Sequence, residues 1–184
     1  MSELILSANQ GDRVAAESLA EQLNKATSIL AVYPVLLKQC VAKKAQACAS
    51  GVVYQAMKQL KRADTAPPVP PAGIPASAIP SSREFDPVLL SLSKLAKSVA
   101  PINDVLALEV LDETVAAANR SEIDTAQGRT GFEMDVFKII AAKNETRARQ
   151  AAEDLKDPLR RIVALAAIYQ WKADELAKAT KAKR

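Results

Sequence analysis

The chain has 184 residues, with 25 Lys and Arg against 21 Asp and Glu and no histidine at all. Hydrophobic residues make up 49% and charged residues 25%, a globular composition that excludes a disordered polymer and a membrane protein as a description of the whole chain. The formal charge of +4 is mild, so it favours solubility more than it predicts an acidic partner.

The composition predicts an all-α protein. Aromatic residues make up only 4%, there are five glycines, and alanine, the best helix former, is abundant. We expect a helical bundle of about five to six helices with a Pro-rich extended segment in the middle. Residues 1–64 would form a helical hairpin or one kinked long helix, 65–86 a strap or linker, and 87–184 a helical bundle that can also pack with 1–64 as one domain.

The first segment has no basic region followed by a long apolar stretch, so no signal peptide is visible. A cytoplasmic location is favoured if the chain is complete, and a periplasmic or extracellular one if a signal peptide was removed. Apolar residues at helical spacing then predict helices over about 8–31 and 35–63. Because proline disfavours helical geometry in the residue before it, we place a break or kink at 32–34, around Pro34.

The two cysteines, Cys40 and Cys48, both fall in the second of these helices. Eight residues along one continuous helix would separate their Cα atoms by about 12 Å, whereas a disulfide needs less than about 7 Å. We therefore expect two reduced, helix-packed thiols. The alternative is a disulfide-closed loop in an oxidising compartment, which would make the second predicted helix wrong.

The segment 65–86 contains six prolines, which exclude a helix and favour an extended, partly polyproline II conformation. It could be a semi-rigid spacer or a strap lying over a helical surface. The apolar residues Val69, Ile74 and Ile79 favour the strap, because a plain spacer has little reason to carry them.

Two helix starts are marked by Asp86-Pro87 and by Asp157-Pro158, an N-cap followed by proline at the first helical position. Between them we expect a short helix over 88–97, a longer one over 102–118 and a turn at 128–131. One further helix then begins at Phe132, with a charged and mostly solvated middle at 143–154. The turn, Gly-Arg-Thr-Gly, lacks the lysine and the preceding strand of a phosphate loop.

The last helix has the clearest period, with steps of four and three that are typical of a coiled-coil or bundle seam. This seam consists of Leu155, Leu159, Ile162, Ala166, Tyr169, Ala173, Leu176 and Thr180. Apolar residues also lie off the seam at Val163, Leu165, Ile168 and Trp171, which is more than one partner helix can cover. We favour the central helix of the bundle as the explanation, with an oligomer or partner interface as the alternative. The candidate interface residues are Leu159, Ile162, Val163, Leu165, Ile168, Tyr169 and Trp171.

The absence of histidine excludes the commonest general base, serine and cysteine triads with histidine, and histidine-based zinc or di-iron motifs. Carboxylates cluster at Glu109, Asp112 and Glu113 and at Glu122 and Asp124, but a solvated helix face explains them better than acid/base catalysis. We expect no enzyme, no catalytic, cofactor-binding or metal-binding residue, and no membrane span.

Basic residues form a candidate patch that could bind nucleic acid if its members converged on one face. The patch consists of Lys58, Lys61, Arg62, Lys178, Lys181, Lys183 and Arg184. Cations at helix C-termini also occur without any ligand, because the helix dipole favours them. The leading hypothesis is therefore a non-enzymatic helical interaction protein, a subunit or adaptor of a larger assembly that binds a protein partner or itself. Nucleic-acid binding is the alternative.

Overall fold

The computed structural model describes residues 26–42, 45–65, 86–121 and 130–182, together with Val14 and Ser18. Every regular element in these residues is a helix, which confirms the predicted all-α class. The helices are α3 (Ala26–Ala42), α4 (Gln46–Thr65), α5 (Pro87–Val99), α6 (Asp104–Arg120), α7 (Asp135–Ala141), α8 (Glu145–Glu153) and α9 (Pro158–Ala182). The predicted Pro-rich strap lies outside the described residues.

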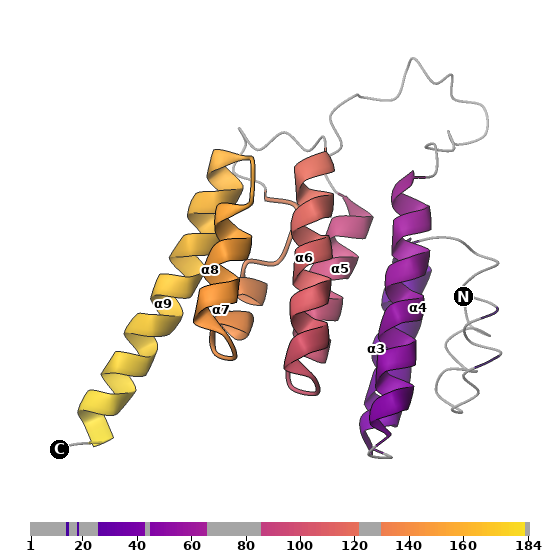
Figure 1. Cartoon of the computed structure of the whole chain (residues 1–184), viewed down its shortest axis with the longest axis horizontal. Helices are drawn as coiled ribbons and strands as arrows, with labels where there is room; N and C mark the ends of the chain where they lie inside the picture. Colours follow the sequence, from indigo (N-terminus) through magenta and orange to yellow (C-terminus); the bar gives the residue numbers. More distant parts are fainter. Residues whose placement is uncertain are drawn as a thin grey trace.

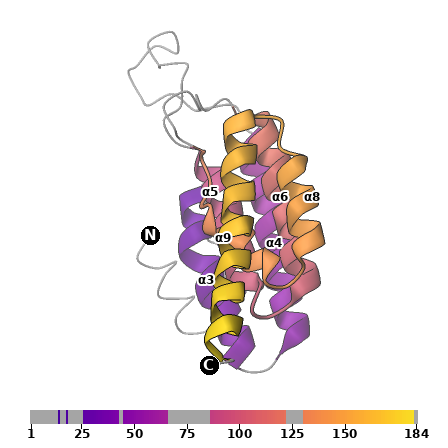
Figure 2. The same ribbon diagram turned by 90° about the vertical axis from the view of Figure 1, so that its left-hand side faces the viewer.

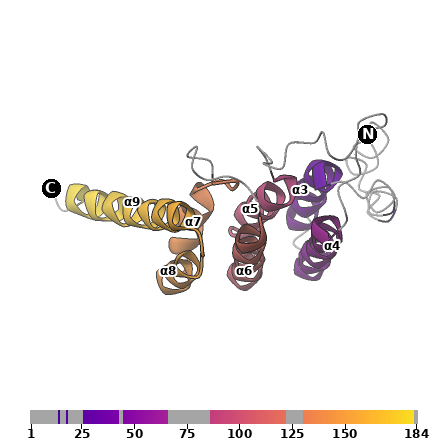
Figure 3. The same ribbon diagram turned by 90° about the horizontal axis from the view of Figure 1, so that it is seen from above.

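The helices form a two-layered row in which the pair α3 and α4, the pair α5 and α6, and the group of α7, α8 and α9 follow one another (Figure 1). Seen from above, α3, α5, α7 and α9 follow one another in one layer, and α4, α6 and α8 follow one another in the second (Figure 3). In such a row each unit covers only its neighbours, so among the described helices those at the two ends each have a face that no other described helix covers. Helix α9 lies at one end of the row.

One continuous hydrophobic core runs through all seven described helices. Its largest fully buried side chains include Tyr33 and Leu37 on α3, Leu111 on α6, Phe137 on α7 and Ile168 on α9. Alanines such as Ala96, Ala107, Ala148 and Ala164 are also fully buried and allow close approach of neighbouring helices. The alanine-rich composition therefore serves packing as well as helix propensity.

The two predicted aspartate–proline helix starts are confirmed. Asp86 Oδ1 accepts hydrogen bonds from the Val88 and Leu89 N–H groups at 3.0 and 3.1 Å, and Asp157 Oδ1 accepts one from the Arg160 N–H at 2.8 Å. Each carboxylate pairs a backbone donor that has no partner inside its helix. Of the turn predicted at 128–131, the structure describes Thr130 and Gly131, and Gly131 has a φ of 80°, which favours glycine.

Of the predicted break or kink at 32–34, the break is wrong, because α3 continues through Pro34 and ends at Ala42. The kink stays a prediction. Proline costs roughly 3 kcal/mol inside a helix. Tyr33 and Leu36 on either side of it are almost completely buried, and burial of such side chains contributes about 1.5–3 kcal/mol each, which offsets that cost. Tertiary packing therefore overrides the local preference of the proline.

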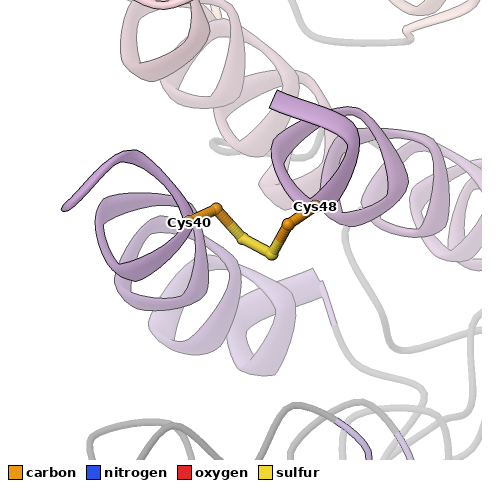
Figure 4. Close-up of a disulfide and its surroundings, with 2 residues drawn as sticks. All are labelled: Cys40 and Cys48. Carbon is orange, nitrogen blue, oxygen red and sulfur yellow. A yellow bond between two sulfur atoms is a disulfide. The ribbon is translucent and has the colours of Figure 1, made fainter. Parts of the chain in front are cut away.

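The break comes instead between α3 and α4, where it brings the two cysteines together. The Ala45 N–H donates to the Cys40 carbonyl at 2.9 Å and joins the end of α3 to the residue before α4. Cys40 and Cys48 then lie 5.6 Å apart at Cα and form a disulfide that links α3 to α4 (Figure 4). The prediction of two reduced thiols is wrong because it assumed one continuous helix from 35 to 63.

The helix predicted to begin at Phe132 is in fact two helices, α7 and α8. Asn144 separates them, since its Oδ1 accepts from the Arg147 N–H at 3.1 Å as an N-cap. Asn103 caps α6 in the same way, through the Leu106 N–H at 3.0 Å. The predicted solvation of 143–154 holds only in part, because Ala148 and Ala152 are fully buried.

A buried arginine joins the end of α6 to the start of α9. Arg160 is 3% exposed, its Nε donates to the Thr130 carbonyl at 2.9 Å, and its Nη1 donates to the Ala118 carbonyl. Ala118 lies in the last turn of α6, where backbone carbonyls have no partner inside the helix and the dipole favours a cation. Next to it, Asn119 donates to the Asp154 carbonyl at 2.9 Å and accepts from the Lys156 N–H at 2.8 Å.

Candidate functional site

Helix α9 attaches to the row by one narrow face. Arg160, Ala164 and Ile168, spaced four residues apart, are the buried residues of this helix. Leu165 and Trp171 are partly buried and pack against the same core. This face contacts α7 and α8, and α9 extends beyond them toward its C-terminal end (Figure 1).

The regular seam lies on the opposite, uncovered face. We define the α9 seam as the residues of the predicted seam that lie within α9: Leu159, Ile162, Ala166, Tyr169, Ala173, Leu176 and Thr180. Leu159 is half-buried and the other six are exposed, including Ile162 at 64%, Tyr169 at 53% and Leu176 at 64%. Within the described part of the chain no helix lies beyond α9, which faces the viewer in Figure 2.

The favoured prediction, that this helix is central in the bundle, is therefore wrong. Of the candidate interface residues, Ile168 is buried, Ile162 and Tyr169 are exposed, and Leu159, Val163, Leu165 and Trp171 are half-buried. The period is regular, but the period alone does not show which face the rest of the chain covers. The large apolar residues off the seam, Ile168 and Trp171, are the ones that attach the helix to its neighbours.

Ion pairs hold α9 against α7 and α8. Lys172 Nζ lies 2.7 Å from Glu145 Oε1, and Lys138 Nζ lies 2.7 Å from Asp174 Oδ2. The Arg149 guanidinium lies 5.4 Å from the centre of the Tyr169 ring, a cation–π contact between α8 and the seam. Since these groups are partly exposed, each pair adds little to stability but helps to fix the rotation of α9.

These two ion pairs predict a dependence of α9 on pH. The hydrogen bond from Lys172 lowers the pKa of Glu145, and that from Lys138 lowers the pKa of Asp174. A carboxyl group whose pKa is lower in the folded state than in the unfolded state stabilises the folded protein at pH values above its unfolded pKa, about 4. This stabilisation is lost as the pH falls through the lowered pKa of the folded state. Acidification below about pH 4 should therefore loosen α9.

Carboxyl titration followed by NMR tests this directly. We expect midpoints for Glu145 and Asp174 below those of ordinary carboxyls. Lys172→Met should raise the Glu145 midpoint and leave that of Asp174 unchanged, and Lys138→Met should do the reverse. Trp171, the single tryptophan of the chain and a residue of α9, should change its fluorescence over the same pH range. Ordinary midpoints in the unmodified protein would contradict the two pairings.

The first half of the predicted basic patch lies in a groove between α4 and α6. Lys58, Lys61 and Arg62 from α4 line this groove, which has a volume of about 640 Å³. The same groove is lined by three carboxylates from α6, Glu109, Asp112 and Glu113. The structure thus brings together the basic cluster and the carboxylate cluster, which the sequence predicted separately and about fifty residues apart.

Contacts across the groove neutralise much of its charge. Lys61 Nζ lies 2.6 Å from Glu113 Oε1, and the Tyr54 hydroxyl donates to Glu109 Oε2 at 3.0 Å. The latter hydrogen bond raises the pKa of Tyr54. Burial raises the pKa of Asp112, although Arg147 lies 2.9 Å away and acts in the opposite direction. Three cations and three carboxylates face one another, so the groove is not a uniformly positive surface.

The second half of the basic patch lies elsewhere. Lys178 and Lys181 are exposed on the last turns of α9, where Lys178 pairs with Glu175 at 2.8 Å, and Lys183 and Arg184 lie outside the described residues. The end of α9 and the helix α4 lie at opposite ends of the row (Figure 1). The two halves of the predicted patch therefore do not converge on one face.

No group of three or more carboxylates and cysteines in the described part of the chain is arranged to hold a metal ion. None of the described helices combines the length and apolar character needed to cross a bilayer. Comparison of the chain with protein-family models, with curated proteins and with solved structures found no match.

Proposed function

We propose that this chain is a non-enzymatic helical interaction protein, a subunit or adaptor of a larger assembly, and that it binds a protein partner through the α9 seam. The observation that carries the proposal is the exposure of this seam. Single exposed apolar residues are ordinary, but a stripe repeated over three heptads on an uncovered face is typical of helix pairing.

The way α9 is held supports the same function. Its buried face and its ion pairs to α7 and α8 fix the helix before any partner arrives, so binding would order little of the backbone. The overhanging C-terminal half gives a second helix access to Leu176 without displacing another element. A rigid helix with an accessible apolar seam is one of the common surfaces for helix recognition.

A non-enzymatic role is supported by what the chain offers for catalysis. It contains no histidine, and its carboxylates at Glu109, Asp112 and Glu113 face lysines and arginines across an open groove. Acid/base catalysis by two carboxylates requires environments that shift their pKa values apart. Burial raises the pKa of Asp112, but its side chain is 53% exposed and it pairs with the Arg147 guanidinium at 2.9 Å, which is not the enclosed environment of a catalytic acid.

Quantitative affinity capture from the native source tests the proposal. Three baits are compared: the unmodified protein, the seam variant Ile162→Lys/Leu176→Lys, and the control Val105→Lys, which alters an equally exposed apolar residue on α6. We expect the seam variant to lose specific partners by about tenfold or more, since each buried apolar side chain contributes about 1.5–3 kcal/mol. The control should retain them. Equal capture by all three folded baits would contradict the proposal.

The alternative function, nucleic-acid binding, has less support. Its candidate residues divide between a charge-balanced groove and a distant helix end, whereas phosphate binding needs cations on one face. Fluorescence polarisation with labelled duplex and single strands at low and high salt tests it. We expect no binding at low salt; salt-sensitive binding that falls in Lys58→Ala/Arg62→Ala would favour the alternative instead.

A further inference from the structure

We infer that the partner of the α9 seam is the α9 seam of a second copy of this chain, paired antiparallel. This inference rests on the proposed function and specifies its partner. In heptad terms, Leu159, Ala166, Ala173 and Thr180 occupy position a, and Ile162, Tyr169 and Leu176 occupy position d. The positions opposite the seam, Ala164 and Trp171, are the ones that pack against the protein's own core. The helix therefore has one face for its own chain and one for another helix.

The sizes of the side chains favour the antiparallel arrangement. A parallel pair would place Tyr169 against Tyr169 and Ala166 against Ala166. Layers overfilled by two tyrosines would then alternate with layers left unfilled by two alanines. An antiparallel pair joins each a position to a d position of the second copy. One register then places Ala166 opposite Tyr169, Ala173 opposite Ile162 and Leu159 opposite Leu176. Each alanine faces a large residue, which is how helix layers fill space without voids.

Antiparallel helices align the positive end of one helix dipole with the negative end of the other. The two-fold axis would cross α9 between Ala166 and Tyr169, with the two helical rows on opposite sides.

Two measurements test the inference on the full chain. In sedimentation, we expect a dimer that forms as concentration rises, because the small residues at position a make the pairing weak. Leu176→Glu should raise the dimer dissociation constant by roughly a hundredfold. Both copies carry the substitution, so it removes two contacts between Leu176 and Leu159, one at each end of the helix pair. Val105→Glu should leave it unchanged, and circular dichroism should show that both variants remain folded.

Cysteine cross-linking tests the register. Two single variants, Ile162→Cys and Ala173→Cys, are oxidised alone and as a mixture, with Cys40 and Cys48 already joined to each other. The mixture should give a mixed cross-linked dimer, while each variant alone should not, because two copies of position 162 would be about 16 Å apart along the pair. Cross-linking of each variant to itself, or no cross-linking in the mixture, would overturn the register.

The outcomes separate this inference from the proposed function. A strict monomer at all concentrations, combined with seam-dependent capture of a different protein, overturns the self-pairing and leaves the proposed function standing. A dimer that Leu176→Glu does not weaken also overturns the self-pairing. Capture that is unaffected by the seam variant removes the proposed function itself.

Discussion

Replacement of Arg160 by methionine is expected to lower the free energy of unfolding by about 3 kcal/mol. The guanidinium donates to the backbone carbonyls of Thr130 and Ala118, and a buried carbonyl left without a donor costs about 1–3 kcal/mol. Part of this loss is offset, because burial of the charge is itself unfavourable and lowers the pKa of Arg160. The guanidinium nevertheless stays protonated, so the charge remains opposite the negative end of α6.

Urea unfolding followed by Trp171 fluorescence measures this effect. The matched control is Arg147→Met, which removes an exposed arginine paired with Asp112 at 2.9 Å and should change the free energy of unfolding by less than about 1 kcal/mol. Arg160→Lys should also destabilise, because one ammonium group cannot reproduce the fork that reaches both carbonyls. An Arg160→Met variant as stable as the original would show that the desolvation cost of the cation equals the stabilisation from its hydrogen bonds.

The helix starts at Asp86 and Asp157 could be predicted because the chemistry of an N-cap is local: the carboxylate binds backbone N–H groups two or three residues away. Asn144 has the same chemistry, and the asparagine before Glu145 was a signal that could have divided the helix predicted to begin at Phe132. Pro34 illustrates the opposite case. Its local preference for a break is overridden by burial of Tyr33 and Leu36, which depends on distant helices.

In the candidate site, too, features set by local geometry could be predicted and features set by long-range packing could not. Alternating steps of four and three identify the α9 seam from sequence, because they depend only on helix geometry. Its exposure follows from the position of α9 at the end of the row, which long-range packing decides. In the groove, Lys61 and Glu113 are 52 positions apart in sequence, so their ion pair was not predictable from either cluster alone. Arg160 is a buried structural cation, and its acceptor carbonyls, on Thr130 and Ala118, lie 30 and 42 positions away in the sequence, so no local pattern marks it.

Reduction of the Cys40–Cys48 disulfide is expected to lower the free energy of unfolding by about 2.5 kcal/mol, the chain-entropy value for a loop of this length. For a chain of this size the corresponding fall in the melting temperature is about 5–10 °C. The bond restricts the unfolded chain, and in the folded state it sets the close approach of α3 and α4 at their shared turn (Figure 4). Both effects stabilise the helical pair at the end of the row opposite α9 (Figure 1).

Thermal unfolding with and without a thiol reductant measures the loss. The variant Cys40→Ser/Cys48→Ser should melt like the reduced protein and should not respond to the reductant. Thiol labelling in denaturant should find no free cysteine in the oxidised protein, and two after reduction. Equal melting temperatures in both conditions would show that Cys40 and Ala45 are held together by their backbone hydrogen bond and by helix packing alone.

Because of the Cys40–Cys48 disulfide, the stability of the protein depends on the redox state of its compartment. Disulfides persist in oxidising compartments and are kept reduced in the cytosol. Because α3 packs on α5 as well as on α4, loosening of the first helical pair would also uncover part of the core, including Leu37 and Val53. Alkylation of free thiols in intact cells, before lysis, should therefore find Cys40 and Cys48 protected. If both are alkylated, the protein works with its first helical pair held by apolar packing alone, and its stability in the cell matches that of the double serine variant.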